Sequence, residues 1–419
     1  MTRGREVPLR EAARGVAEKL IGAGYEAYFA GGCVRDVLLG REPTDFDIAT
    51  SATPEQIVAV FPRARGVGES FGVMLVREWG HTFEVATFRE DGPYHDGRRP
   101  SEIHFSTAER DAQRRDFTVN GMFEHPLTGE PVDFVDGRAD IAAKLIRAIG
   151  DPHARIHEDR LRMLRAVRFA ARLGFAIEPA TSAAVREHAT ELRAVSPERV
   201  GDEVRKMLEH PARLRATTLV EEHQLDRAVF GGEASIGGLP RVAALPHPSG
   251  AATVLAAWWL DRLARDAARD DRSAPRPDAS ARSSAISGLR TRLVLTNHET
   301  DALRNALDVR EALLAGFDGL GHAARVRCIA RPGFDAALDV LMGERPADAA
   351  RWRAVADREL PTRSLPEPLL DGNALVAEGM RPGPRFKVLL DLAMDAQIEG
   401  RIASLADALQ LVRAADRTG

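Results

Sequence analysis

Cysteine is scarce in this 419-residue sequence: only Cys33 and Cys328 are present, and neither belongs to a Cys-x-x-Cys pair. Two isolated cysteines exclude a disulfide framework and a cysteine-rich zinc site, and they favour a reducing compartment. Long apolar runs are missing too, because residues 251–263 are interrupted by Asp261 and Arg262, whereas a membrane span needs about 18 apolar residues in a row. The first residues, MTRGREVPLREAARG, hold no apolar segment typical of a secretory signal. We therefore expect a cytoplasmic protein without a membrane span.

Lysine and aromatic residues are also few. Only four of the 58 basic residues are lysines, and aromatics make up 5% of the chain. The net charge of −4 excludes a wholesale basic surface for nucleic acid but permits a local one. Alanine, leucine, valine and arginine dominate instead, a composition that favours helices.

The residue pattern divides the chain into two parts. Over roughly the first 140 residues, β-like runs (27–30, 46–49, 72–77, 82–88) alternate with short helical segments (8–22, 35–39, 55–61). Thr53 and Pro54 have the types expected of a cap and first helical residue before the segment 55–61. Later segments have helical period, including one long helix over Arg155–Leu173. We predict an α+β fold with a sheet of four or five strands, then an all-helical remainder in which residues 264–284 form a flexible loop.

The segment 29–40 suits a phosphate group. An apolar strand passes through Gly31 and Gly32 directly into a helix, so backbone N–H groups can approach a ligand and the helix N-terminus attracts an anion. The alternative interpretation is a tight turn in which Arg35 and Asp36 form a surface pair.

Asp45 and Asp47 lie two residues apart at the start of an expected strand, so both side chains project from the same face. Two carboxylates this close repel each other, and a shared divalent cation relieves the repulsion. Oxygen ligands suit Mg²⁺, which completes its shell with waters and substrate phosphates. The alternative is a pair of solvent-exposed aspartates. Glu84, within the run 82–88, is either a third acidic group at this place or an ordinary surface residue of its strand.

The segment RRDFTVNGM combines Arg114, Arg115, Asp116 and Asn120 within seven positions. Arginine forks suit a triphosphate, while the carboxylate and the amide can bond ribose hydroxyls. A capped helix start with a surface charge cluster is the alternative.

The expected helix over Arg155–Leu173 has the most informative pattern. At about 100° per residue its apolar side chains share one arc, and the opposite arc holds Arg162, Arg165, Arg168 and Arg172. Four like charges need either solvent or an anion. Asp159, three residues before Arg162, completes an acceptor–donor pair that matches the exocyclic amine and adjacent ring nitrogen of cytosine or adenine.

Two histidines, His153 and His157, lie one helical turn apart just before this pattern. No histidine–aspartate metal pair is recognisable around them, and we interpret them as helix-surface residues.

The order of these motifs resembles that of the class II tRNA nucleotidyltransferase and bacterial poly(A) polymerase family. The resemblance is dense over residues 25–210 and weaker over 369–412. Its main segments are GGCVRDVLLG (31–40), TDFDIAT (44–50), RRDFTVNGM (114–122), EDRLRMLRAVRFAARLGF (158–175) and SPERVGDEVRKML (196–208). It implies a polymerase-β-type nucleotidyltransferase head over residues 1–140, a helical neck with a nucleotide template over 141–210, a helical body over 211–360 and an RNA-binding helical tail over 361–419.

The resemblance also implies roles for single residues of the head. Asp45 and Asp47 correspond to the catalytic, metal-binding carboxylates, with Mg²⁺ as the expected cofactor. Gly32 and Arg35 match positions that hold the incoming nucleotide.

Further nucleotide-binding positions follow the head. Arg115 matches a nucleotide-binding arginine of the family. Asp159 and Arg162 match the protein template that pairs with CTP or ATP, and Arg165 and Arg168 match positions that hold the phosphates.

The activity implied is CCA addition, in which CMP, CMP and AMP are transferred from CTP and ATP to the tRNA 3′ end. Residues 89–106 look like the flexible loop of enzymes that add A, and the chain end AADRTG lacks the basic extension common in poly(A) polymerases. The alternatives are an A-adding tRNA nucleotidyltransferase and a poly(A) polymerase. A catalytically silent RNA-binding relative is disfavoured, because Asp45 and Asp47 are both present.

Overall fold

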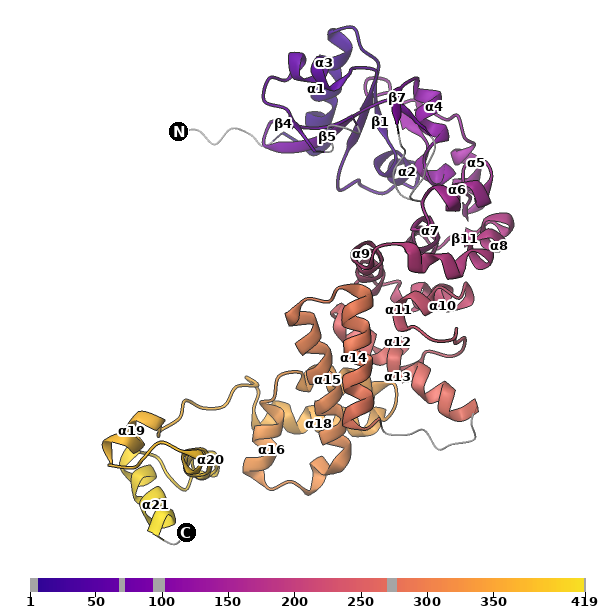
Figure 1. Cartoon of the computed structure of the whole chain (residues 1–419). Helices are drawn as coiled ribbons and strands as arrows, with labels where there is room; N and C mark the ends of the chain where they lie inside the picture. Colours follow the sequence, from indigo (N-terminus) through magenta and orange to yellow (C-terminus); the bar gives the residue numbers. More distant parts are fainter. Residues whose placement is uncertain (1–6, 68–71, 93–101, 270–276, 418–419) are drawn as a thin grey trace. The chain divides into compact units, whose positions relative to one another are not determined.

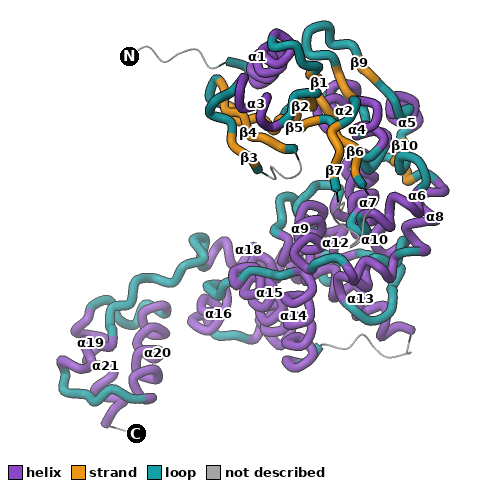
Figure 2. Tube along the Cα trace, turned by 45° about the horizontal axis from the view of Figure 1, so that its top comes forward, coloured by secondary structure: helices purple, strands orange, loops and turns teal. Residues whose placement is uncertain are grey.

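The computed structural model describes residues 7–67, 72–92, 102–269 and 277–417. The chain divides into two compact units, Met1–Ile236 and Gly237–Gly419. Among the described residues strands occur only in the first unit, and the second is helical (Figures 1 and 2). The predicted fold class, an α+β head followed by helices, is therefore confirmed.

The first unit contains a seven-stranded sheet in the order β3-β4-β5-β2-β1-β8-β9. Its strands are β1 (Ala27–Ala30), β2 (Asp47–Thr50), β3 (Arg65–Gly66), β4 (Val73–Glu78), β5 (His81–Thr87), β8 (Phe123–Glu124) and β9 (Pro131–Val132). Strands β2 and β5 run parallel, and the other neighbours are antiparallel. The prediction of four or five strands is too low, because two-residue strands such as β3, β8 and β9 are too short to show alternation.

Helices cover both faces of this sheet. On one face α1 (Leu9–Gly22) and α3 (Pro54–Val60) pack on a core that includes Phe29, and on the other face α4 (Ala108–Gln113) packs on a core that includes Ala30 (Figure 1). This alternation follows from the period of two along β1. The predicted cap of α3 is confirmed, because the Thr53 hydroxyl accepts a hydrogen bond from the Gln56 N–H.

The segment predicted as a flexible loop, residues 89–106, begins and ends in regular structure. Strands β6 (Arg89–Asp91) and β7 (Ile103–Phe105) form an antiparallel hairpin. The central part, residues 93–101, lies outside the described residues.

The predicted long helix over Arg155–Leu173 is wrong, because the chain forms two helices there. Helix α6 (Pro152–Glu158) ends at Asp159, which has an extended backbone with φ −148° and ψ 104°. Helix α7 begins at Arg162 and continues to Leu173. The Asp159 carboxylate accepts the N–H of Leu161 at 3.1 Å, which stabilises the break. Asp159 and Arg162 are thus not neighbours on one helix.

Helix α7 packs against α9 and α10, and further elements complete the first unit. They are α2 (Gly32–Leu38), η2 (Thr118–Asn120), α5 (Gly137–Ala143), β10 (Leu145–Ile146), β11 (Ala176–Ile177), α8 (Pro179–Glu187), η3 (Ala189–Ala194), α9 (Pro197–Leu208), α10 (Arg213–Glu222) and α11 (Asp226–Phe230).

The second unit is helical, and its described residues include one apolar core within 309–360 and another within 370–412. Its elements are α12 (Pro240–Ala244), α13 (Ala251–Arg269), α14 (Ala279–Leu293), α15 (Asn297–Gly316), η4 (Phe317–Gly319), α16 (His322–Ile329), α17 (Phe334–Met342), α18 (Pro346–Glu359), α19 (Gly372–Ala377), α20 (Pro384–Ile398) and α21 (Leu405–Arg417). The prediction of a loop over 264–284 is wrong at both ends, which belong to α13 and α14; residues 270–276 lie outside the described residues. In the described part of the chain every helix falls short of what crossing a membrane requires.

Candidate active site

A cavity of about 720 Å³ lies within the first unit, and its wall is strongly charged. Eight arginines and six aspartates line it, together with Gly31, Gly32, Thr44, Asn120 and Phe169. The charged residues are Arg35, Arg89, Arg114, Arg115, Arg162, Arg165, Arg172, Arg199, Asp36, Asp45, Asp47, Asp91, Asp116 and Asp159. Of the nine site residues predicted from the sequence, all except Arg168 are part of this wall.

Asp45 and Asp47 lie where the chain enters β2, and both side chains are accessible to solvent. The pKa of Asp47 is raised from 3.8 to about 6, first by burial and then by the negative charges of Glu84 and Asp45, against the opposing charge of Arg115. The influence of Glu84 follows from the parallel register of β2 and β5, in which Ile48 lies opposite Val85. Carboxylate repulsion at this place favours a cation between the side chains.

The Gly31-Gly32 turn has a conformation that only glycine adopts easily. Gly31 has φ +73°, and a Cβ atom there would lie 3.1 Å from Nη1 of Arg115. Its N–H donates to the carbonyl of Met122 at 3.0 Å, which ties the turn to the chain before β8. The turn therefore brings the backbone of Gly32, the first residue of α2, to the cavity wall next to a guanidinium group.

Arg35 is buried, with 5% of its surface exposed. Its Nη1 donates to Oδ1 of Asn120 at 2.6 Å, and its Nε donates to Oδ1 of Asp36 at 2.9 Å. The interpretation of Arg35 and Asp36 as a surface pair is therefore wrong. Arg35 links the turn to the segment 114–122, and that segment is no surface charge cluster.

Asp111 holds the arginines of that segment and was missed by the sequence analysis. Its carboxylate, 1% exposed, accepts from Nη2 of Arg114 at 2.6 Å and from Nη2 of Arg115 at 2.8 Å. Burial alone would raise the pKa of Asp111, but the guanidinium groups of Arg115 and Arg114 outweigh it and hold the pKa below its usual range. The spacing i, i+3 and i+4 along α4 is the signal that identifies this residue.

Asp159 and Arg162 both line the cavity, but Asp159 lies between two helices and not, as the sequence predicted, on one helix with Arg162. The two oxygens of Asp159 accept from Arg199, on α9, at 3.1 and 2.7 Å. Arg162 donates from Nη1 to Oε2 of Glu158 at 2.6 Å and from Nη2 to the carbonyl of Arg114 at 3.3 Å. Arg199 was missed, because it is 40 residues from Asp159 and no local pattern connects the two.

Arg165 and Arg168 of α7 also have carboxylate partners. Arg165 donates from Nε and Nη2 to Oδ2 of Asp116 at 2.8 and 2.6 Å. The negative charge of Asp116 raises the pKa of Arg165. Arg168 donates to Oε2 of Glu203 at 2.6 Å and lies over the ring of Phe169. The interpretation in which solvent alone balances the arginine charges of α7 is therefore wrong.

The charges of the site form a fixed array. Opposed carboxylates hold the arginine forks in place, and Arg115 and Arg165 keep further N–H groups for a ligand. An arrangement of this kind binds a polyphosphate, while the acidic pair at β2 provides oxygen ligands for a divalent cation. Its chemistry suits nucleotidyl transfer.

Two family models match the first unit. The model described as "Poly A polymerase head domain" matches residues 27–147, which include β1, the acidic pair and the segment 114–122. The model described as "Probable RNA and SrmB- binding site of polymerase A" matches residues 174–230.

Whole-length comparisons extend this likeness to the complete chain. The CCA-adding enzyme of Lactiplantibacillus plantarum is 32% identical over 413 residues, which cover 95% of this chain and 94% of that protein. The crystal structure of the Bacillus stearothermophilus CCA-adding enzyme in complex with CTP is 29% identical and has a TM-score of 0.76, covering 99% of this chain and all of the other. The Thermotoga maritima CCA-adding enzyme complexed with tRNA, 19% identical with a TM-score of 0.65, covers 96% of this chain and 94% of the other and shares its fold. This chain belongs to the CCA-adding enzyme family.

Proposed function

We propose that this protein is a CCA-adding tRNA nucleotidyltransferase that transfers CMP, CMP and AMP from CTP and ATP to the 3′ end of tRNA and releases pyrophosphate. One observation carries the proposal: a single cavity brings the acidic pair Asp45 and Asp47 together with Asp159, Arg162 and their supporting groups. The family to which the chain belongs supports the same reaction.

Base selection is assigned to Asp159 and Arg162. The carboxylate accepts a hydrogen bond from the exocyclic amine of cytosine or adenine, and the guanidinium donates to the adjacent ring nitrogen. Guanine and uracil lack an amine at that place and are rejected. Arg199 holds the carboxylate of Asp159, and Glu158 holds the guanidinium of Arg162. These contacts keep both base-binding groups in the same position whether the base is cytosine or adenine.

Phosphate binding is assigned to Gly32, Arg115 and Arg165. The backbone at Gly32 and the two guanidinium groups, held by Asp111 and Asp116, meet at the cavity wall. Arg35 acts as a positioning residue, since its own donors are taken up by Asn120 and Asp36.

We assign Arg168 a positioning role as well. Its partner Glu203 has its other oxygen 4.0 Å from Nη1 of Arg165, so Arg168 orients Arg165 through a shared carboxylate.

The acidic pair fits a divalent cation, and we propose Mg²⁺. The fit follows from the oxygen donors of Asp45 and Asp47 and from the raised pKa of Asp47, to which burial contributes most and the negative charges of Glu84 and Asp45 contribute next. A cation bound there supplies charge neutralisation at the transferring phosphate and lowers the pKa of the attacking 3′-hydroxyl. The remaining groups of the cavity position the triphosphate in line with that hydroxyl, and positioning of this kind supplies most of the rate in nucleotidyl transfer.

The test uses three tRNA transcripts that end at the discriminator base, at C and at CC. Each is incubated with Mg²⁺ and CTP, ATP or both, and the products are resolved at single-nucleotide length. Addition of C, C and A, with no further extension, is expected. Addition of A to the CC-ending transcript alone would identify an A-adding enzyme, and long A tails would identify a poly(A) polymerase. Asp45→Ala serves as the control, with transfer lost and tRNA binding retained.

A further inference from the structure

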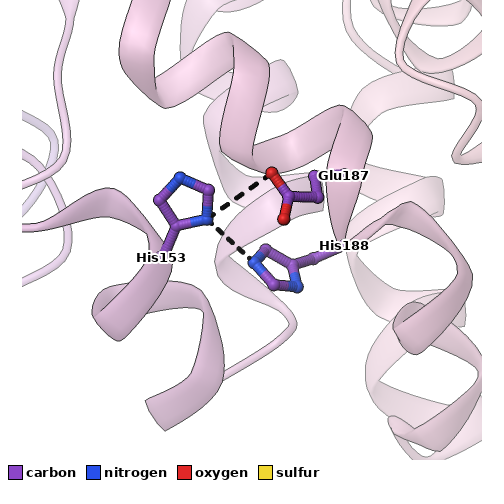
Figure 3. Close-up of side chains that lie close together, drawn as sticks. All are labelled: His153, Glu187 and His188. Carbon is purple, nitrogen blue, oxygen red and sulfur yellow. Dashed lines mark hydrogen bonds and ion pairs between the residues drawn. The ribbon is translucent and has the colours of Figure 1, made fainter.

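A group of histidine and glutamate side chains lies outside the cavity, where α6 meets the end of α8. His153 belongs to α6, Glu187 is the last residue of α8, and His188 follows it directly. Figure 3 shows the three side chains turned toward one another. The interpretation of His153 as a plain helix-surface residue is therefore incomplete, because its ring contacts the buried ring of His188.

The distances within this trio match those of a metal site. Nδ1 of His153 lies 3.0 Å from Nε2 of His188 and 3.9 Å from Oε2 of Glu187. One ligand atom from each residue falls within 4.8 Å of the other two. A tetrahedral ion with bonds of 2.0–2.1 Å separates its ligand atoms by about 3.4 Å, so small side-chain adjustments bring all three onto one ion.

The surroundings of His188 prepare one of its nitrogens for a metal. Nδ1 of His188 lies 2.7 Å from Oε1 of Glu191, and Arg160 donates to the other carboxylate oxygen at 3.0 Å. With Nδ1–H donated to Glu191, Nε2 of His188 carries the lone pair. Metal-bound histidines are oriented by carboxylates in the same way.

A second trio, His157 with His188 and Glu191, fits an ion less well. Its closest pair, Nδ1 of His188 and Oε1 of Glu191, is only 2.7 Å apart. This separation departs further from the edge of about 3.4 Å expected for a metal tetrahedron than the 3.0 Å between His153 and His188 does. Glu191 is therefore assigned to the support of His188, and Glu187 to the ion.

We propose that Nδ1 of His153, Nε2 of His188 and the carboxylate of Glu187 form a binding site for a late first-row divalent cation, with Zn²⁺ as the best fit. Two imidazoles and a carboxylate suit Zn²⁺, whereas Mg²⁺ prefers an all-oxygen shell. The ion fastens α6 to the end of α8. Asp159 follows directly after α6. An ion at this site therefore fixes the position of the helix that precedes the carboxylate proposed to bind the base.

The experiment titrates the full-length, chelator-treated protein with Co²⁺ in millimolar Mg²⁺, which occupies the oxygen sites. Visible absorption reports tetrahedral Co²⁺, and competition with Zn²⁺ gives the Zn²⁺ affinity. One equivalent with a tetrahedral spectrum is expected for the wild type. His153 is half-buried and Glu187 is exposed, so the fold should persist in His153→Gln and in Glu187→Gln, and each should weaken binding at least 10-fold. Glu191→Gln should weaken it about 10–100-fold, as for other residues that orient a metal ligand.

His157→Gln is the matched control, since it changes a histidine on the same helix that packs on His188 but is not one of the three proposed ligands. Unchanged affinity in this variant supports the assignment. Loss of binding in His157→Gln, or equal affinity in the wild type and His153→Gln, would overturn it and leave the short contact between His153 and His188 as an ordinary hydrogen bond. Circular dichroism of each variant verifies that the helices are retained.

Discussion

Replacing Asp47 with asparagine should stabilise the protein while it abolishes transfer. The folded protein raises the pKa of this carboxyl from 3.8 to about 6, mainly through burial and then through Glu84 and Asp45. The folded state therefore binds the proton more tightly than the unfolded chain, and ionisation of Asp47 destabilises the fold. The pKa difference sets an upper limit of about 3 kcal/mol. Because Asp47 remains accessible to solvent, screening reduces the expected effect to about 1 kcal/mol.

The assay is thermal unfolding of Asp47→Asn and wild type in metal-free buffer across a range of pH. About 1 kcal/mol corresponds to a rise in Tm of about 2–4 °C for a unit of this size. The sign of the pH dependence is fixed by the raised pKa: the advantage of the variant should be full above pH 6 and should shrink as the pH falls toward 3.8, where wild-type Asp47 is protonated. Addition of Mg²⁺ with CTP should raise the Tm of the wild type more than that of the variant.

Asp202→Asn is the matched control for this experiment. Asp202 is exposed on α9 and pairs with Arg205 three residues later, so its replacement should change stability by no more than about 0.5 kcal/mol. Glu84→Gln should give a smaller rise than Asp47→Asn, because it removes one of the repelling charges. A lower Tm for Asp47→Asn at every pH would refute the reasoning and remove the electrostatic basis for a cation at the pair.

Three further substitutions test other contacts of the cavity. Asp159→Ala should weaken discrimination against UTP and GTP more than it weakens triphosphate binding, and unchanged base choice in a competition assay would place the template elsewhere. Asp111→Asn leaves Arg115 without its buried carboxylate and should lower the stability by about 3 kcal/mol and raise the KM for CTP; a KM equal to that of the wild type would contradict the positioning role. Gly31→Ala should reduce stability by about 1–2 kcal/mol in urea unfolding, since φ is positive there, and an unaffected urea midpoint would show that the turn relaxes freely.

Local patterns in the sequence predicted several features of the head of the protein correctly. The strand at residues 27–30, the cap at Thr53 and the acidic pair at the start of β2 depend on neighbours within a few positions, and all of them occur in the structure as predicted. Asp111 belongs to the same class, because its partners Arg114 and Arg115 lie within one turn. Its position relative to the two arginines is therefore a signal that the sequence itself contains.

Contacts between distant residues explain what the sequence did not predict. The helical period through residues 155–173 is continuous, and nothing local shows that the chain leaves the helix at Asp159. The break allows the carboxylate to meet Arg199 across 40 positions of sequence. His153 and His188, 35 residues apart, are brought together in the same way. Periodicity identifies which face of a helix is polar, but only packing determines which polar partner the face meets.

Pairing of the arginines explains how an acidic protein maintains a site for polyanions. Arg115, Arg165 and Arg162 are held by Asp111, Asp116 and Glu158, so the local charges nearly balance while the forks remain fixed. A planar guanidinium has five N–H donors, and an ion pair with one carboxylate leaves the rest for phosphate oxygens. Lysine offers a single flexible ammonium group and cannot serve a carboxylate and a phosphate in the same defined geometry. Preorganised pairs of this kind give directional binding of a triphosphate without a large positive potential, in agreement with a net charge of −4 for the chain.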